Sequence, residues 1–245
     1  MQSFKSTISP AATSTSKLLL PRNVNASTQV LSGPTLLKPY SPIKYNLLPT
    51  LNQARSVFDQ RNRRHLVKND LRTLFRKHSV EDKLGVGLVH RHFDLRPEER
   101  LVEYNGTSTP WQCRDCFLGR KIVPIAWQLD AEGMFPYEFR FSTTSEDAKE
   151  VLDLQRQSNF LGAFNDILRS HGLSSVIGLC PMPAEGVQSS LEVTHGRANI
   201  NIPRSELREK EWNDETTETM WFFDTMSNAT YACKCSNVME SHRHY

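Results

Sequence analysis

The sequence has no long apolar run. Its 245 residues contain no stretch of the roughly 18 apolar residues that a membrane-spanning helix needs. The longest apolar stretch near the N-terminus, Leu18-Leu19-Leu20, is too short for the core of a secretory signal. These two absences predict a cytoplasmic protein with no membrane partner.

Cysteine and net charge are also scarce. The chain has five cysteines, an odd number, which favours reduced thiols over a disulfide framework. Its 30 basic and 27 acidic residues leave a net charge of +3, which argues against a nucleic-acid partner. Gly85-Val86-Gly87 lacks the third glycine and the following helix of a phosphate-binding loop. We therefore expect no nucleotide cofactor.

Acidic residues are missing from the first part of the chain, where the first one is Asp59. Residues 1–45 are rich in Ser, Thr, Pro and Asn, and their apolar residues show no sustained period, which predicts a disordered tail. An alternative is import into an organelle through this acid-free N-terminus. We expect a single domain over residues 46–235 and a flexible C-terminal tail over 236–245.

The remaining sequence predicts an α+β domain. Helical patterns begin at Thr50 and cover residues 69–77, and Ser145 opens one long central helix that ends at Gly172. Strand patterns cover residues 86–93, 101–104, 122–129, 137–142, 175–179, 191–202, 220–224 and 230–233. The order predicts an antiparallel or mixed curved sheet with N-terminal helices and one long central helix.

Two details of the sheet follow from short motifs. Asn105-Gly106 predicts a tight hairpin turn, and the short connections around it predict an antiparallel meander over residues 85–143. In residues 191–202, Ala198, Ile200 and Ile202 alternate with asparagines. This alternation predicts that the apolar residues face the core.

The His90-Arg91-His92 motif is the most specific sign of chemistry. On a strand, residues i and i+2 point to the same face, so both imidazoles can reach one metal ion. A nearby carboxylate from Glu98, Glu99 or Glu103 would complete a set suited to iron, manganese or zinc. The alternative is a pair of packed histidines with a structural or ligand-binding role.

This motif resembles the cupin family, which has a His-x-His pair followed by a Glu and a Gly. His90 and His92 match the pair, the interval from Glu99 to Gly106 matches the Glu-to-Gly spacing, and His195 with Asn199 matches a later His-x-x-x-Asn element. The gap after His92 is longer than in that family. The resemblance implies a metal-dependent oxygenase or isomerase, with His195 and Asn199 as weaker site candidates.

Cysteine spacing suggests a second metal site. Cys113-x-x-Cys116 and Cys233-x-Cys235 could together hold a zinc ion, which would make the chain a zinc-stabilised interaction protein. The alternative is ordinary reduced cysteines.

The segment 82–93, with Leu101-Val102-Glu103 and Pro110-Trp111 after it, resembles a group of uncharacterised filamentous-fungal proteins. Members of that group can lie near genes of small-molecule biosynthesis. The resemblance implies an accessory role in fungal secondary metabolism and identifies no catalytic residue. Aromatic residues of the strand regions could line an apolar pocket. Our leading hypothesis is therefore an accessory protein that binds a small apolar molecule, and the sequence leaves open whether it is an enzyme.

Overall fold

A computed structural model describes most of the chain after residue 36. The described residues are 37–61, 65–112, 122–130, 132–142, 153–154, 156–183, 189–209 and 216–223, together with the backbone of 230–236. They belong to the compact unit Leu31–Tyr245.

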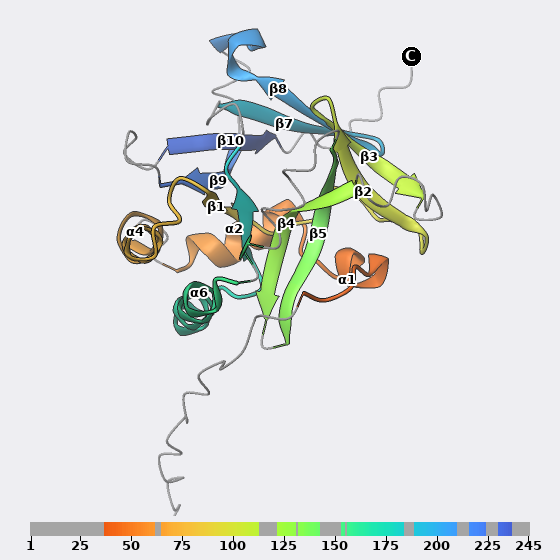
Figure 1. Ribbon diagram of the computed structural model, residues 1–245. Coiled ribbons are helices and arrows are strands. Elements are labelled where there is room, and N and C mark those ends of the chain that lie inside the picture. The colour runs from red at the N-terminus through yellow and green to blue at the C-terminus, as the bar shows by residue number, and fades with distance from the viewer. Residues whose placement is uncertain are drawn as a thin grey trace, which may run out of the picture. The chain divides into compact units, whose positions relative to one another are not determined.

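The strands of this unit form one mixed, closed sheet (Figure 1). Around the barrel they follow the order β1-β6-β4-β5-β2-β3-β8-β7-β10-β9. Their bounds are β1 Leu84–Leu88, β2 Glu99–Tyr104, β3 Thr107–Gln112, β4 Ile122–Asp130, β5 Gly133–Phe141, β6 Ile177–Pro181, β7 Ser190–His195, β8 Ala198–Pro203, β9 Thr216–Phe222 and β10 Thr230–Ser236.

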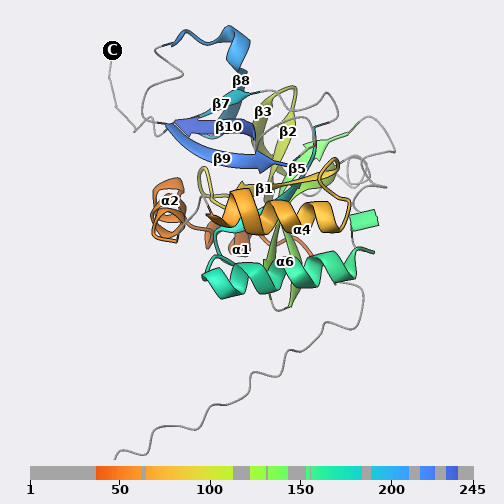
Figure 2. The ribbon, with the colours of Figure 1, turned by 90° about the vertical axis from the view of Figure 1, so that its left-hand side faces the viewer.

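Helices α4 and α6 lie side by side against one side of this barrel (Figure 2), and α1 lies on another side, next to β5 (Figure 1). The bounds of the helices are α1 Pro42–Asn46, α2 Leu51–Asp59, the π-helix η1 Leu66–Leu71, α4 Arg72–Lys77, α6 Ser158–His171 and the 3₁₀ helix η2 Arg204–Glu206. The largest core cluster fills the space between helices and sheet. At its centre, the Phe75 ring contacts Phe160 at a centroid distance of 5.1 Å and Phe223 at 4.7 Å. Of the helices described, none is long and apolar enough to cross a membrane.

The α+β prediction with a mixed curved sheet is confirmed, and so is the turn at Asn105-Gly106. Both turn residues have positive φ values, 50° and 75°, as a two-residue hairpin loop requires. The predicted meander is wrong, because β1 pairs with β6 and β9 instead of β2. β2 also pairs in parallel with β5. Pairing between strands distant in the chain closes the sheet, and short-range turn signals do not encode it.

Two predicted boundaries need correction. The helix predicted from Ser145 is not continuous, because the chain leaves helical geometry at Gln157 (ψ 47°) and α6 begins at Ser158; residues 143–152 lie outside the described residues. The predicted N-terminal tail, residues 1–45, extends too far along the chain. α1 belongs to the domain, and the Tyr45 side chain is fully buried.

The predicted strand over residues 191–202 is instead a hairpin of β7 and β8 that turns at Gly196. Its expected alternation does not hold, since Ile200 is 37% exposed and Asn201 is also exposed, whereas Asn199 is 3% exposed. The asparagine faces a polar cluster inside the barrel, which satisfies its amide. The alternation of apolar and polar residues therefore did not predict which of these side chains are buried.

Candidate metal centre

The two histidines lie just after a strand and not within one. β1 ends at Leu88, and the following segment carries His90 and His92 toward each other. Their ring centroids are 4.7 Å apart, with an angle of 71° between the ring planes. His90 is 6% exposed, and the side chain of His92 is 3% exposed. The predicted proximity of the pair is confirmed, although its expected strand geometry is not.

The α1 region holds this segment in place. The amide side chain of Asn46 donates to the Leu95 carbonyl oxygen and accepts from the Leu95 N–H, both at 2.8 Å. The backbone N–H of His92 donates to the hydroxyl oxygen of the buried Tyr45 at 3.3 Å. Arg91 donates to the Asn46 carbonyl oxygen at 3.2 Å. One short helix thus holds the chain at Arg91, His92 and Leu95.

His90 has the protonation pattern of a metal ligand. Its Nδ1 lies 2.7 Å from the Leu88 carbonyl oxygen, which can only accept, so Nδ1 carries the hydrogen. In the neutral ring this places the lone pair on Nε2. Burial lowers the pKa of His90, and neighbouring His92 lowers it further. A neutral ring with one nitrogen bonded to a backbone carbonyl is the usual arrangement of a metal-binding histidine.

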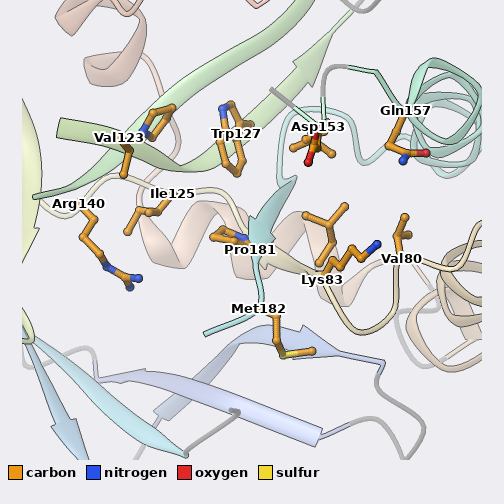
Figure 3. A pocket seen from close by; sticks show the side chains of 13 residues that line it. Val80, Lys83, Val123, Ile125, Trp127, Arg140, Asp153, Gln157, Pro181 and Met182 are labelled. Carbon is orange, nitrogen blue, oxygen red and sulfur yellow. The ribbon is translucent and has the colours of Figure 1, made fainter. Parts of the chain in front are cut away.

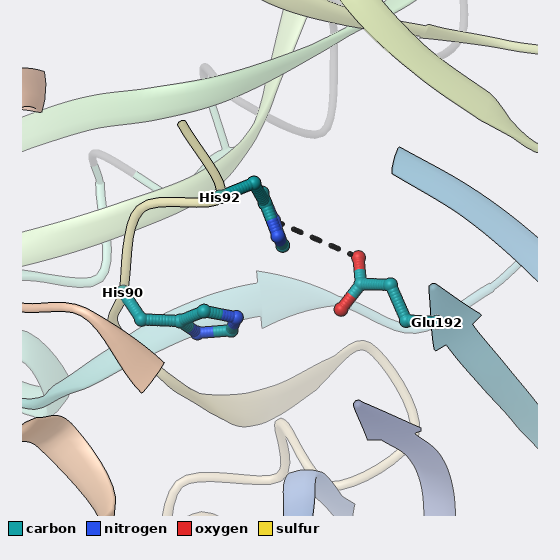
Figure 4. Close-up of side chains that lie close together, drawn as sticks. All are labelled: His90, His92 and Glu192. Carbon is teal, nitrogen blue, oxygen red and sulfur yellow. Dashed lines mark ion pairs between the residues drawn. The ribbon is translucent and has the colours of Figure 1, made fainter. Parts of the chain in front are cut away.

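His92 lies between two carboxylates. Its Nε2 is 3.2 Å from Glu138 Oε1. The same nitrogen is 3.7 Å from Glu192 Oε1 (Figure 4). Burial opposes a charge on the ring, but Glu192 and Glu138 outweigh burial and raise the pKa of His92. The side chain of Glu138 is 15% exposed and that of Glu192 is 13% exposed. The electrostatic environment of His92 Nε2 is therefore negative, which favours the binding of a cation.

The site lies inside the barrel. Glu138 comes from β5 and Glu192 from β7, and these strands are separated in the wall by β2, β3 and β8. Strands that are not neighbours in a closed sheet bring side chains together only across its interior. Asn199 of β8 completes the cluster, because its amide donates to Glu192 Oε1 and lies 3.3 Å from His92 Nε2.

Ligand atoms of His90, His92 and Glu192 lie within 4.8 Å of one another, the one such group of His, Cys, Asp and Glu among the described residues. A tetrahedral ion with bonds of about 2.1 Å holds its ligand atoms about 3.4 Å apart. The widest pair would therefore need to close by at most about 1.4 Å, a shift of the size that side-chain rotation supplies. Two imidazoles and a carboxylate suit iron, manganese or zinc, with positions left for other ligands.

The prediction that Glu98, Glu99 or Glu103 supplies the third ligand is wrong, because none of them belongs to the group that contains His90 and His92. Glu98 is exposed. Glu99 forms an ion pair with Arg197, and Glu103 forms one with Arg140.

Of the two residues in the later His-x-x-x-Asn element, only Asn199 lies at the site. His195 is exposed at the end of β7, whereas Asn199 is buried beside His92. Glu138 and Glu192 escaped prediction because each is a single acidic residue in a strand. A single carboxylate in a strand does not reveal which side of the sheet it faces.

The zinc alternative lies largely outside the described residues. Cys113 and Cys116 fall in the segment 113–121, which is not described. For Cys233 and Cys235 the structure gives only the backbone of β10, where Cys233 is paired with Ser190 of β7. This hypothesis stays a prediction.

A pocket of about 260 Å³ opens where β4 and β6 separate (Figure 3). Most of its lining residues are apolar, among them Val123, Ile125, Trp127, Pro181 and Met182, and Gln157 is polar. Charged groups at its margin are Lys83, Arg140 and Asp153. The volume is just under the roughly 300–1,000 Å³ typical of small-molecule sites. The pocket therefore suits a small ligand.

Comparisons with protein-family models, with curated proteins and with solved structures find no match for this chain.

Proposed function

We propose that this protein binds one divalent transition-metal ion through His90, His92 and Glu192 and uses it to transform a small molecule. The observation that carries this proposal is the buried cluster of two imidazoles and a carboxylate, with His90 already in the ligand tautomer. The donor set fits iron, manganese or zinc. The reaction classes that we propose are oxygenation and isomerisation.

Glu138 has a separate role in this proposal. Its carboxylate accepts the hydrogen of the same His92 nitrogen that would bind the ion, so the ion would have to displace this proton. Glu138 would then lie next to the metal position without belonging to the compact ligand group. A carboxylate in that place can accept a proton from a substrate or water bound to the ion. Asn199 holds Glu192 and so orients a ligand.

The test is elemental analysis of the purified, untagged protein after growth with iron, manganese and zinc. We expect stoichiometric metal in the wild type, and loss of that metal in His90→Ala and Glu192→Gln while the far-UV circular dichroism spectrum is kept. The matched controls are His195→Ala and Glu98→Gln, which remove the same residue types from exposed positions. Metal-free wild-type protein, or equal metal in His90→Ala and His195→Ala, contradicts the proposal.

A second candidate is a small-ligand-binding accessory protein of fungal secondary metabolism, in which His90 and His92 are structural. The observation that favours it is the pocket between β4 and β6, which needs no metal. The two candidates differ in the elemental analysis, since a binder of this kind keeps its ligand affinity and contains no stoichiometric metal.

A further inference from the structure

The pocket exists because two neighbouring strands separate. β4 and β6 share only the pairs Trp127↔Leu179 and Gln128↔Gly178. Before Trp127, the pairing of β4 with its other neighbour, β5, has register irregularities on both sides of Ala126. Each side of the opening also carries a proline, Pro124 and Pro181, which has no N–H to donate to a neighbouring strand. The opening is thus built into the backbone of the barrel wall.

Arg140 places a positive charge at this opening. It lies on β5 opposite Val123 of β4, and Figure 3 places it across the pocket from Lys83. Its Nε donates to Glu103, and the described residues provide the guanidinium with no other hydrogen bond or ion pair. The two terminal nitrogens can therefore bind a carboxylate through parallel hydrogen bonds, a geometry that arginine favours.

The pocket also adjoins the proposed metal centre. Arg140 and Glu138 are two residues apart on β5, so their side chains share a face of the sheet, about 7 Å apart along the strand. On the other side of the opening, Met182 packs against the cluster of Cys180 and Phe222. The pKa of Cys180 is raised by burial and also by Glu138, which places the thiol within electrostatic range of that carboxylate.

We propose that the pocket binds a small apolar carboxylic acid in its ionised form, with the carboxylate on Arg140 and the apolar part against Ile125, Trp127 and Met182. The pocket volume limits the ligand to a medium-length chain or a single ring. That this acid is the substrate rests on the proposed metal-dependent function, whereas its binding does not.

The test is isothermal titration calorimetry with octanoate, and with 1-octanol as the neutral probe of the same chain length. We expect saturable binding of octanoate, and weaker binding of octanol. Arg140→Gln should weaken octanoate binding about tenfold or more, because a charge-assisted hydrogen bond is lost, and should leave octanol binding unchanged. Ile125→Trp should abolish the binding of both probes by filling the pocket.

Glu103→Gln is the matched control for Arg140→Gln. It removes the same ion pair but keeps the guanidinium, so it should bind octanoate at least as tightly as the wild type. If Glu103→Gln loses octanoate binding as Arg140→Gln does, the ion pair acts structurally and the proposal is wrong. It is equally wrong if the wild type shows no saturable octanoate binding, or if Arg140→Gln binds octanoate normally.

The metal-binding proposal and the ligand proposal can be refuted independently of each other. Octanoate binding to chelator-treated protein and to His90→Ala should match that of the untreated wild type, because neither change touches the pocket lining. A protein without metal that still binds octanoate contradicts only the metal-dependent function. A metal-containing protein that binds no octanoate contradicts only the ligand assignment.

Discussion

Substituting Gly178 by alanine should break the narrow contact that joins β4 and β6. An added Cβ at this position would lie 2.4 Å from the Trp127 carbonyl oxygen and 2.9 Å from a methyl group of Val89. The carbonyl is backbone, so it cannot rotate away as a side chain would. Gly178 supplies one of the two residue pairs between these strands, so a shift that relieves the clash separates them.

Two costs add in this variant. Forcing an extra methyl group into a packed site costs roughly 1–3 kcal/mol. Losing one or two backbone hydrogen bonds adds about 0.5–1.5 kcal/mol each. A loss near 4 kcal/mol would be a large part of a typical total of about 5–15 kcal/mol. For a chain of this length it would lower Tm by about 8–16 °C.

Thermal and urea unfolding, followed by circular dichroism, measure this loss. Gly162→Ala is the matched control, since an added Cβ there meets no atom within 4 Å and the residue lies inside α6. Removing a helical glycine should raise the free energy of unfolding by about 0.5–1 kcal/mol. Our account is refuted if Gly178→Ala unfolds within about 0.5 kcal/mol of the wild type.

Three further predictions concern single side chains. Asn199→Ala should weaken metal binding about 10–100-fold in a competition titration with a chelating dye, because Glu192 loses its orienting hydrogen bond; unchanged affinity argues against that role. Burial raises the pKa of Cys180 from 9.0 to about 12, so at pH 8 its thiolate is about a thousandfold scarcer than that of an ordinary cysteine. Peptide mapping after iodoacetamide should find Cys180 unmodified in the folded protein, and rapid alkylation there would contradict the burial argument. The hydrogen bond from Arg197 lowers the pKa of Glu99, so this pair stabilises the fold at neutral pH and loses that effect as the pH falls through the lowered pKa. Glu99→Gln should therefore be less stable than the wild type at pH 7, with a gap that narrows in acid unfolding experiments; a gap that is constant with pH excludes this linkage.

Local sequence signals were sufficient for several elements. The Asn105-Gly106 turn follows from two residues that tolerate positive φ. The end of α6 at Gly172, which has a φ of 66°, follows from the same property. The His-x-His motif likewise brought two imidazoles together, because residues two apart cannot be distant in space. Each of these signals depends on neighbours along the chain.

The rest of the candidate site depended on contacts between distant residues. Nothing near His92 in the sequence indicates Glu138 or Glu192, which are 46 and 100 positions away. The nearby carboxylates that the sequence favoured, Glu99 and Glu103, form ion pairs with Arg197 of the β7–β8 turn and Arg140 of β5. The sequence by itself therefore determined the α+β class, the Asn105-Gly106 turn and the histidine pair, because these rest on short-range periodicity and backbone preference. Only the tertiary structure decided which carboxylates meet the histidines and where the wall opens, because the order of strands in a closed sheet is set by packing over the whole chain.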